Sequence, residues 1–408
     1  MSPAVFRIII VGGGIAGFAA AIALREPNRN ITVLEQSSLN KEIGALISFQ
    51  PNASRIIQSD WGLDLQNARP MVDEGFRIYN TDGKLINAIP LLVKKEYEGD
   101  RLLFHRRDLH DNLKQHAMSD FSSGKGNPVE VRVASKVVKC DVLSGIVELE
   151  TGEKLSADLI IGADGIHSVV RRYVLPEEPQ PMPTGLSAYR LMISTEILEK
   201  EEPDFCSKIN PREPFTSMIV AHNCRLIMGP GRQGEVYGIT ALVPDEQMNE
   251  DPNAKQSWVA EGDLNKILQT FSEFPDWVTS IFKYEITDFP LKDRCSPIIQ
   301  RHSSDLGLWQ LRDLNPLAKW HSGRVVLIGD AAHAMLPTQG QGASQAIEDA
   351  EALGAFFEDI SDPPSPEDIS SILETVIQAR YSRASLIQAY SRQAAKPGTM
   401  KGENTVTM

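Results

Sequence analysis

The sequence has no surplus of basic residues. Its 41 Lys and Arg residues stand against 54 Asp and Glu residues, which gives a formal net charge of −13 at pH 7. Proteins that bind nucleic acids need a concentrated basic surface to neutralise the phosphate backbone. The charge balance therefore argues against a nucleic-acid partner.

Cysteines and long apolar stretches are scarce as well. The four cysteines are widely separated and form no Cys-x-x-Cys pair, so we expect reduced thiols, a cytoplasmic compartment and no metal centre. The uncharged stretch over residues 8–24 is shorter than the roughly 18 residues or more of a membrane span, and glycines interrupt it. We therefore expect no membrane-spanning segment.

Size and composition instead indicate a globular protein with more than one domain. The chain has 408 residues, of which 42% are hydrophobic. A single hydrophobic core rarely grows beyond about 250–300 residues. Two domains are therefore the expectation.

A glycine motif near the N-terminus indicates a dinucleotide site. Gly12-x-Gly14-x-x-Gly17 lies between a predicted buried strand and a predicted Ala-rich helix. Glycines let the backbone approach a pyrophosphate, whose charge the helix N-terminus stabilises. Glu35 ends the next predicted strand, where its carboxylate would accept hydrogen bonds from ribose hydroxyls. This motif fits FAD and NAD equally.

Two acidic motifs follow predicted strands further along the chain. Asp164-Gly165 and Gly329-Asp330 each come directly after a short apolar segment. Ligands of an open α/β sheet bind at the carboxyl ends of its strands. Three motifs at that edge therefore predict one common site.

A second match to the glycine pattern lies at Gly229-x-Gly231-x-x-Gly234. Predicted strands precede and follow it, so no helix N-terminus would face a phosphate there. We interpret it as a hairpin connection and not as a site for NAD(P)H.

The middle of the chain has a different character. Its predicted strands are separated by turns without intervening helices, which is typical of an antiparallel sheet. These strands cover residues 186–194, 215–221, 226–228 and 236–243, and a hairpin over residues 76–89 joins the same sheet. Long helices are predicted over residues 341–357 and 369–394.

Taken in order, the three motifs resemble those of the class A flavoprotein monooxygenases, the salicylate- and p-hydroxybenzoate-hydroxylase-like family. The likeness extends over nearly the whole chain and includes the stretch from Gly329 to Ala343. It implies an α/β fold in which a Rossmann-like FAD-binding domain carries an inserted antiparallel substrate domain and ends in long C-terminal helices. It also implies non-covalent FAD, with NADPH or NADH as co-substrate.

The resemblance divides the chain into five segments. The FAD-binding domain is expected to comprise residues 1–70, 101–180 and 296–408, the last with the C-terminal helices. The substrate domain is expected to comprise a hairpin over residues 71–100 and the sheet over residues 181–295.

The family's reaction is implied in the same way. NAD(P)H reduces FAD, O2 adds to give a C4a-hydroperoxyflavin, and one oxygen atom passes to an electron-rich carbon. The favoured substrate is a phenol or another aromatic small molecule, as in the fungal secondary-metabolite branch. Epoxidation of an indole or alkene is the alternative reaction. A flavin dehydrogenase or a non-catalytic flavin-binding protein is the alternative class.

The resemblance also assigns residues to the FAD site. They correspond to the glycine fingerprint, the ribose-binding acid, the two acidic motifs and the flavin-lining loops: Gly12, Gly14, Gly17, Glu35, Ala45, Arg106, Asp164, Asp330, Gly340, Gly342 and Ala343. Alignment on Leu109 selects Arg106, and Arg107 is the competitor one residue along. His333 is expected to be a structural hydrogen-bonding residue.

For the substrate, the resemblance selects Arg190 on the first strand of the predicted sheet. An arginine aimed into a pocket would hold a phenolate or carboxylate and favour the ionised ring, and the alternative is a surface arginine. The chain departs from the family where Leu46 replaces a common glycine and Gly229 replaces a frequent aromatic residue. Tyr237 and His222 are weaker candidates for assisting phenol deprotonation.

Overall fold

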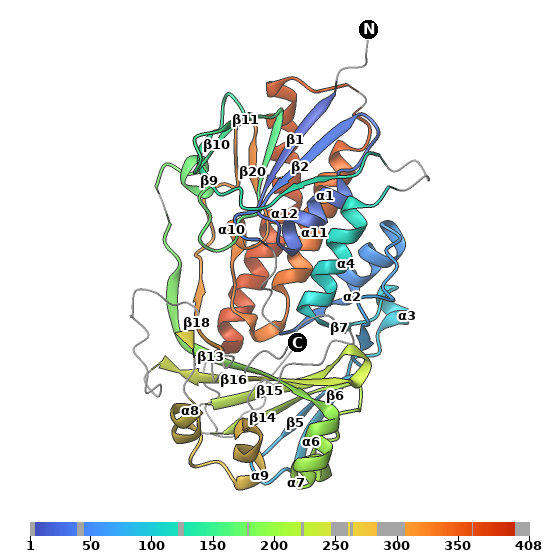
Figure 1. Cartoon of the computed structure of the whole chain (residues 1–408), viewed down its shortest axis with the longest axis vertical. Coiled ribbons are helices and arrows are strands. Elements are labelled where there is room, and N and C mark those ends of the chain that lie inside the picture. Colours follow the sequence, from blue (N-terminus) through green and yellow to red (C-terminus); the bar gives the residue numbers. More distant parts are fainter. Residues whose placement is uncertain are drawn as a thin grey trace, which may run out of the picture.

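A computed structural model describes residues 5–38, 45–120, 126–177, 179–221, 224–245, 260–261, 264–283, 307–360 and 362–395. Figure 1 shows two bodies, an upper one of helices around a parallel sheet and a lower one built on a broad sheet with short helices beneath it. No helix among these residues is both long and apolar enough to cross a membrane.

The upper body contains the predicted Rossmann-like sheet. Its six strands lie in the order β19-β20-β12-β1-β2-β8, and all neighbours are parallel except β19 and β20. The strands are β1 (Phe6–Val11), β2 (Arg29–Leu34), β8 (Glu130–Arg132), β12 (Leu159–Gly162), β19 (His321–Ser322) and β20 (Val325–Leu327). The central strands are almost wholly apolar because both faces of the sheet are covered.

Helices cover one face of this sheet. They are α1 (Ile15–Ala23), α4 (Arg106–Met118), α11 (Gly342–Phe357) and α12 (Pro366–Ala395), and the short α10 (Asp330–His333) precedes α11. α1 and α11 approach closely at Gly354, where an added Cβ would lie 2.8 Å from the carbonyl oxygen of Ala23. The small antiparallel sheet β9 (Val137–Asp141), β10 (Ile146–Leu149) and β11 (Lys154–Ser156) packs near the other face.

The lower body is an eight-stranded sheet in the order β17-β18-β13-β16-β15-β14-β5-β6. Its strands are β5 (Gly75–Tyr79), β6 (Leu85–Pro90), β13 (Met182–Ser194), β14 (Phe215–Ala221), β15 (Cys224–Gly231), β16 (Val236–Pro244), β17 (Ala260–Glu261) and β18 (Gly307–Asp313). The predicted hairpin of residues 76–89 does join this sheet.

Two details of this sheet differ from the expectation. β5 pairs with β14 in parallel, so the sheet is mixed and not purely antiparallel, because the hairpin enters from a distant part of the chain. β18 lies beyond residue 295, where we expected the substrate domain to end, yet it pairs with β13 along the sheet. The other domain boundaries stay predictions.

Side chains alternate between the two faces of the eight-stranded sheet. Tyr189, Leu191 and Ile193 of β13 belong to a core beneath it, which α6 (Thr195–Glu201), α7 (Pro203–Lys208), α8 (Leu264–Thr270) and α9 (Asp276–Thr279) help to enclose. Arg190 and Met192 therefore face the opposite way, toward the FAD-binding body. We call this the upper face of the sheet.

A third sheet connects the two bodies. It consists of β3 (Leu46–Phe49), β7 (Leu102–His105) and β4 (Met71–Val72). α2 (Pro51–Arg55), a π-helical turn (Ile56–Asp60) and α3 (Lys94–Tyr97) lie beside it, and α5 (Arg171–Val174) follows the Asp164 loop. β3 thus runs between the flavin-loop region near Gly340 and the upper face of the large sheet.

The second glycine pattern is a hairpin, as predicted. β15 ends at Gly231, a 3-10 turn covers Arg232–Gly234, and β16 begins at Val236. The two strands pair in antiparallel register from Arg225 to Gly231. No helix follows this turn, so it has no helix N-terminus to offer a phosphate.

Candidate active site

The N-terminal glycine loop is packed backbone against backbone. Gly12 has φ +106°, and an added Cβ there would collide with the carbonyl oxygen of Ala163. An added Cβ on Gly17 would collide with the carbonyl oxygen of Gly12. At Gly14, the N-cap of α1, no described atom lies within 4 Å of the Cβ position. The N-cap of α1 therefore has open space beside it, as the approach of a pyrophosphate to the helix N-terminus requires.

Two side chains hold this loop from either side. Glu35 is half-buried, and its carboxylate accepts hydrogen bonds from the N–H groups of Gly13 at 2.8 Å and Ser37 at 2.7 Å. The buried His110 places Nε2 at 2.7 Å from the carbonyl oxygen of Gly13. Because a carbonyl only accepts, the ring nitrogen donates. His110 was not anticipated, since a histidine inside a helix carries no motif.

The carboxylate of Asp164 organises its own loop. It accepts hydrogen bonds from Ser168 Oγ at 2.5 Å and from the N–H groups of Val169 at 2.7 Å and Val170 at 3.1 Å. Burial raises the pKa of Asp164, and these hydrogen bonds oppose that rise. Its backbone packs against Gly12, which brings the second motif to the first. A direct contact of Asp164 with FAD or NADPH stays a prediction.

The third motif forms a sharp turn at the end of β20. Gly329 has φ +56°, and an added Cβ would lie 2.9 Å from that of Ala16 in α1. Asp330 follows as the first residue of α10, with an exposed side chain. The surrounding protein nevertheless raises the pKa of Asp330, and the charges of His333 and Arg106 oppose this rise. The carboxyl group of Asp330 is therefore accessible to solvent although protein surrounds it on most sides.

A buried carboxylate, Asp349 of α11, holds this turn in place. It accepts hydrogen bonds from the N–H of Gly329 at 2.9 Å, from Nε2 of His333 at 2.6 Å and from Nε of Arg380 at 2.9 Å. Burial would raise the pKa of Asp349, but His333, Arg380 and Gly329 lower it to about 2. His333 is thus buried and hydrogen-bonded, in keeping with a structural role.

The segments that are predicted to line the flavin meet one another. Gly340 has φ +62°, and Ser48 Oγ of β3 donates to its carbonyl oxygen at 3.3 Å. Gly342 begins α11, and the partly buried Ala343 packs against the main core. Ala45 is buried and accepts a hydrogen bond from the N–H of Arg106 at 2.8 Å. Gly44 lies outside the described residues.

The two candidate arginines at the start of α4 differ in their surroundings. Arg106 is half-buried, and its charge acts on both Asp330 and Arg190. Arg107 is exposed and lies 3.7 Å from Asp111 on its own helix. The geometry favours Arg106, although its contact with FAD stays a prediction.

Arg190 lies on the upper face of the sheet, toward the cofactor motifs. Its guanidinium carbon is 4.8 Å from the ring centroid of Trp309 on β18. Burial, and then the like charge of Arg106, lower the pKa of Arg190 to about 10. The reading as a surface arginine is therefore disfavoured. Tyr237 faces the core beneath the sheet, so it cannot assist a substrate on the upper face, and His222 lies outside the described residues.

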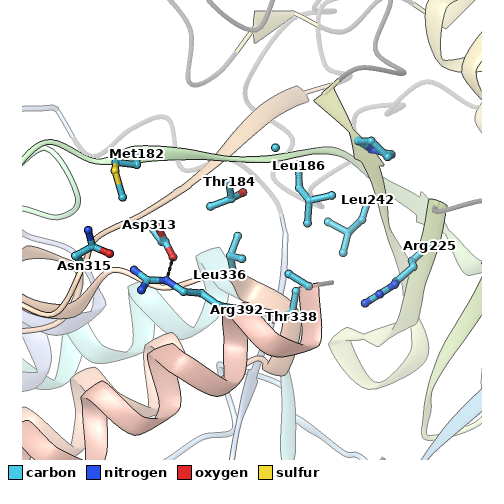
Figure 2. A pocket seen from close by; sticks show the side chains of 13 residues that line it. Met182, Thr184, Leu186, Arg225, Leu242, Asp313, Asn315, Leu336, Thr338 and Arg392 are labelled. Atoms are coloured by element: carbon cyan, nitrogen blue, oxygen red, sulfur yellow. Dashed lines mark hydrogen bonds and ion pairs between the residues drawn. The ribbon is translucent and has the colours of Figure 1, made fainter. Parts of the chain in front are cut away.

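A cavity lies further along the upper face. It measures about 530 Å³ and is lined by β13, β15 and β16 from the sheet and by the segment before Gly340 and the end of α12 on the opposite side. Figure 2 shows Leu186 and Leu242 facing Leu336 and Thr338 across it, with Arg225 at one end. Ala188, on the same strand as Arg190, packs against Leu242 and Leu336.

The structure brings Gly12, Gly17, Glu35, Asp164 and Asp330 to one edge of the parallel sheet, and these residues could hold FAD. In the predicted arrangement, the N-cap of α1 receives the pyrophosphate and Glu35 binds a ribose. Asp330 would bind the ribityl–phosphate portion, and the loop at Gly340 would line the flavin ring. Sequence reasoning missed the buried side chains that hold these loops. Besides His110 and Asp349, Arg171 donates from Nη1 to the carbonyl oxygen of Ala331 at 3.0 Å.

Comparisons with known proteins indicate a protein that binds FAD. Residues 129–359 match the family of FAD binding domains, and residues 10–45 match that of NAD(P)-binding Rossmann-like domains. The chain is 29% identical to hispidin-3-hydroxylase of Neonothopanus nambi over 97% of this chain and 90% of that protein. It is 32% identical to FAD-dependent monooxygenase phomE' of Diaporthe leptostromiformis over 88% of this chain and 85% of that protein.

A solved structure shows the same architecture. A salicylate hydroxylase substrate complex superposes with a TM-score of 0.73 and 26% identity, over 97% of this chain and 91% of that one. FAD is accordingly the cofactor and NAD(P)H the co-substrate. By its motifs, its fold and these relatives, the chain belongs to the FAD-binding-domain family, as one of the class A FAD-dependent monooxygenases.

Proposed function

We propose that this monooxygenase hydroxylates an electron-rich phenol, or a related aromatic small molecule, held against Arg190. The reaction consumes the substrate, NAD(P)H, H⁺ and O2, and yields the hydroxylated product, NAD(P)⁺ and water. When bound, FAD accepts the hydride and delivers the electrons to O2. Relatives named for hydroxylating hispidin and 3-hydroxybenzoate support an aromatic substrate.

The observation that carries this proposal is the pair of half-buried cations, Arg106 and Arg190. The two side chains are close enough that the charge of Arg106 lowers the pKa of Arg190. Two like charges in a partly dry environment repel each other, and an anion between or beside them relieves that repulsion. Arg106 is also balanced by Asp330, which leaves Arg190 as the better anchor for a substrate phenolate or carboxylate.

Arg190 would contribute in two ways. Its planar guanidinium fixes the orientation of the oxyanion, and its charge lowers the pKa of a bound phenol so that the electron-rich phenolate predominates. Trp309 beneath the guanidinium restricts the rotamers of the side chain, so the anchor is held before substrate arrives. A substrate held between the sheet and the FAD-binding body would be shielded from bulk water.

The test combines a substrate screen with one substitution. Phenols and hydroxybenzoates are screened for stimulation of NAD(P)H oxidation, and the product is analysed after reaction under ¹⁸O2. Arg190→Met should retain FAD but lose about two to four orders of magnitude in product formation, and Arg190→Lys should recover only part of it.

Arg77→Met is the matched control. Arg77 lies on the same sheet with its guanidinium carbon 3.5 Å from the ring centroid of Phe215, but it pairs with Glu213. It should keep near-normal turnover. Normal turnover and substrate affinity in Arg190→Met would reject the role of Arg190. Epoxide products, or NAD(P)H oxidation without incorporated ¹⁸O, would select the alternative reaction or class.

We also propose a reducing, cytoplasmic compartment. Among the residues that the structure describes, Cys140 and Cys206 are free thiols, and Cys140 is buried. Such thiols persist where the cell keeps cysteines reduced. Fractionation of the producing cells would test this, and recovery from an oxidising compartment would contradict it.

A further inference from the structure

Three glycines form a notch on the upper face of the large sheet. Gly229 of β15 lies opposite Gly238 of β16, and Gly231 follows two residues along β15. We call Gly229, Gly231 and Gly238 the glycine notch. Leu46 of β3 fills it: an added Cβ would lie 2.6 Å from Leu46 Cδ2 at Gly231 and 2.6 Å from Leu46 Cδ1 at Gly238. A side chain at either glycine would displace the leucine.

The two departures from the family pattern meet in this notch. An added Cβ on Gly229 would lie 3.8 Å from Leu46 Cδ1, which is ordinary van der Waals contact. A larger side chain at position 229 would extend into the space beside Leu46 and Leu103. The leucine therefore supplies, from the flavin-lining strand, apolar volume that the sheet itself lacks here.

The notch borders the row of residues that contains Arg190. Met192 pairs with Gly238, and Arg190 pairs with Thr240 in the same strands. Successive residues on one face of a strand are about 6.6–6.8 Å apart, so Leu46 lies one row from Arg190. On the other side of Arg190, the next row contains Leu242, which lines the 530 Å³ cavity.

The position of Leu46 is fixed from the cofactor side. Ser48 on the same strand donates to the carbonyl oxygen of Gly340, and the N–H of Arg106 donates to the carbonyl oxygen of Ala45. These two hydrogen bonds hold β3 on either side of Leu46, so the leucine is presented to the notch from an anchored strand.

We propose that Leu46 determines which substrates fit beside Arg190, as the apolar wall that closes this side of the substrate space. The proposal rests on the proposed function and specifies it further. The part of the substrate next to this wall must be short and apolar, because Leu46 leaves no room in the notch and offers no hydrogen-bonding group.

A double-mutant cycle tests the packing with FAD at saturation. Gly238→Ala should lower the Tm by about 1–4 °C, because the methyl group overpacks against Leu46. Leu46→Ala should remove most of that penalty when the two are combined. Leu103→Ala is the matched control: Leu103 also lies 3.8 Å from the Gly229 Cβ position but is not among the atoms nearest the Cβ position of Gly238, so it should not rescue Gly238→Ala.

Binding tests the specificity. Phenol and its 4-methyl, 4-propyl and 4-tert-butyl derivatives are titrated into wild type and Leu46→Ala, and dissociation constants are read from the flavin absorption change. Relative to phenol, the variant should bind the bulkier derivatives about tenfold more tightly than wild type does. Leu103→Ala should leave the size preference unchanged.

The outcomes separate cleanly. Additive penalties in the cycle, or the same size preference in Leu46→Ala as in wild type, would overturn the role of Leu46 even if wild type hydroxylates phenols normally. Failure of both proteins to bind any phenol would reject the proposed function and the specificity role with it. The cycle would still decide whether Leu46 occupies the notch.

Discussion

Replacing Asp349 by asparagine should weaken FAD binding although Asp349 is not expected to touch FAD. The residue is 2% exposed and receives hydrogen bonds from Gly329, His333 and Arg380. Its pKa falls from an ordinary 3.8 to about 2 in spite of burial, which corresponds to on the order of 2–3 kcal/mol of net favourable interaction. Breaking a buried ion pair costs about 3–5 kcal/mol, because the partner charge is left uncompensated.

Asparagine keeps the size of the side chain and one acceptor but not the charge. The free energy of unfolding should therefore fall by about 3 kcal/mol in urea titrations at neutral pH. Because Gly329 precedes Asp330, a loosened turn should also cost roughly tenfold in FAD affinity, measured by flavin fluorescence quenching on the apoprotein.

Asp158→Asn is the control for a general loss of stability. Asp158 accepts hydrogen bonds from Arg7 at 2.9 Å and lies just before β12, at the opposite edge of the parallel sheet from the motifs. This variant should lose stability and keep its FAD affinity. Wild-type FAD affinity in Asp349→Asn, or an equal loss in both variants, would refute the positioning role.

The same carboxylate predicts an acid sensitivity. A group whose pKa is depressed by folding stabilises the folded chain fully above its unfolded pKa and loses that effect as pH falls through its folded pKa. The contribution of Asp349 should therefore disappear between pH 3.8 and about 2. Wild type should lose stability more steeply than Asp349→Asn in this window, and parallel curves would contradict the assignment.

Three further predictions concern the cofactors. Heat or acid should release unmodified FAD from the yellow protein, and recovery of a flavin-peptide or of FMN would contradict non-covalent FAD. Glu35→Ala and Asp330→Ala should each weaken FAD binding about tenfold or more, because each removes an ionised acceptor worth about 1.5–3 kcal/mol, and full flavin retention after dialysis of both would show that the cofactor is misplaced. Gly234→Ala, at the hairpin, should leave NAD(P)H affinity intact, and a folded variant that selectively loses NAD(P)H binding would reverse the hairpin interpretation.

The sequence predicted helices and strands well where neighbouring residues determine them. The apolar run of β1, the glycine turn and the Ala-rich α1 are contiguous in sequence, so their order alone fixes the strand–turn–helix unit. The parallel pairing of β5 with β14 has no such local cause. Residues 75–79 and 215–219 are far apart in the sequence and pair only in the folded sheet. Pairing partners across that separation cannot be derived from either segment.

The buried polar residues that hold the site were hidden for a related reason. Asp349 looks like an ordinary acid on a predicted helix, and its partner Arg380 lies on the next one. Only the fold shows that the two face each other and Gly329 in a dry environment. His110 and Arg171 are likewise recognisable only once the loops that they hold are placed. Motifs report the backbone that approaches the ligand and not the side chains that support it.

The two glycine patterns of this chain show that the same sequence pattern can meet different structural requirements. At Gly12 and Gly17, a Cβ would collide with backbone atoms, so glycine is required for the strand, loop and helix to pack around an open helix N-terminus. At Gly231, a Cβ would collide with the side chain of Leu46, so glycine is required to receive a neighbour. The glycines of the first pattern indicate a phosphate site because a helix begins directly after them. The glycines of the second pattern bear on substrate shape because the Leu46 that they receive lies near Arg190. The element that follows the glycines, and not their spacing, therefore decides what the pattern means.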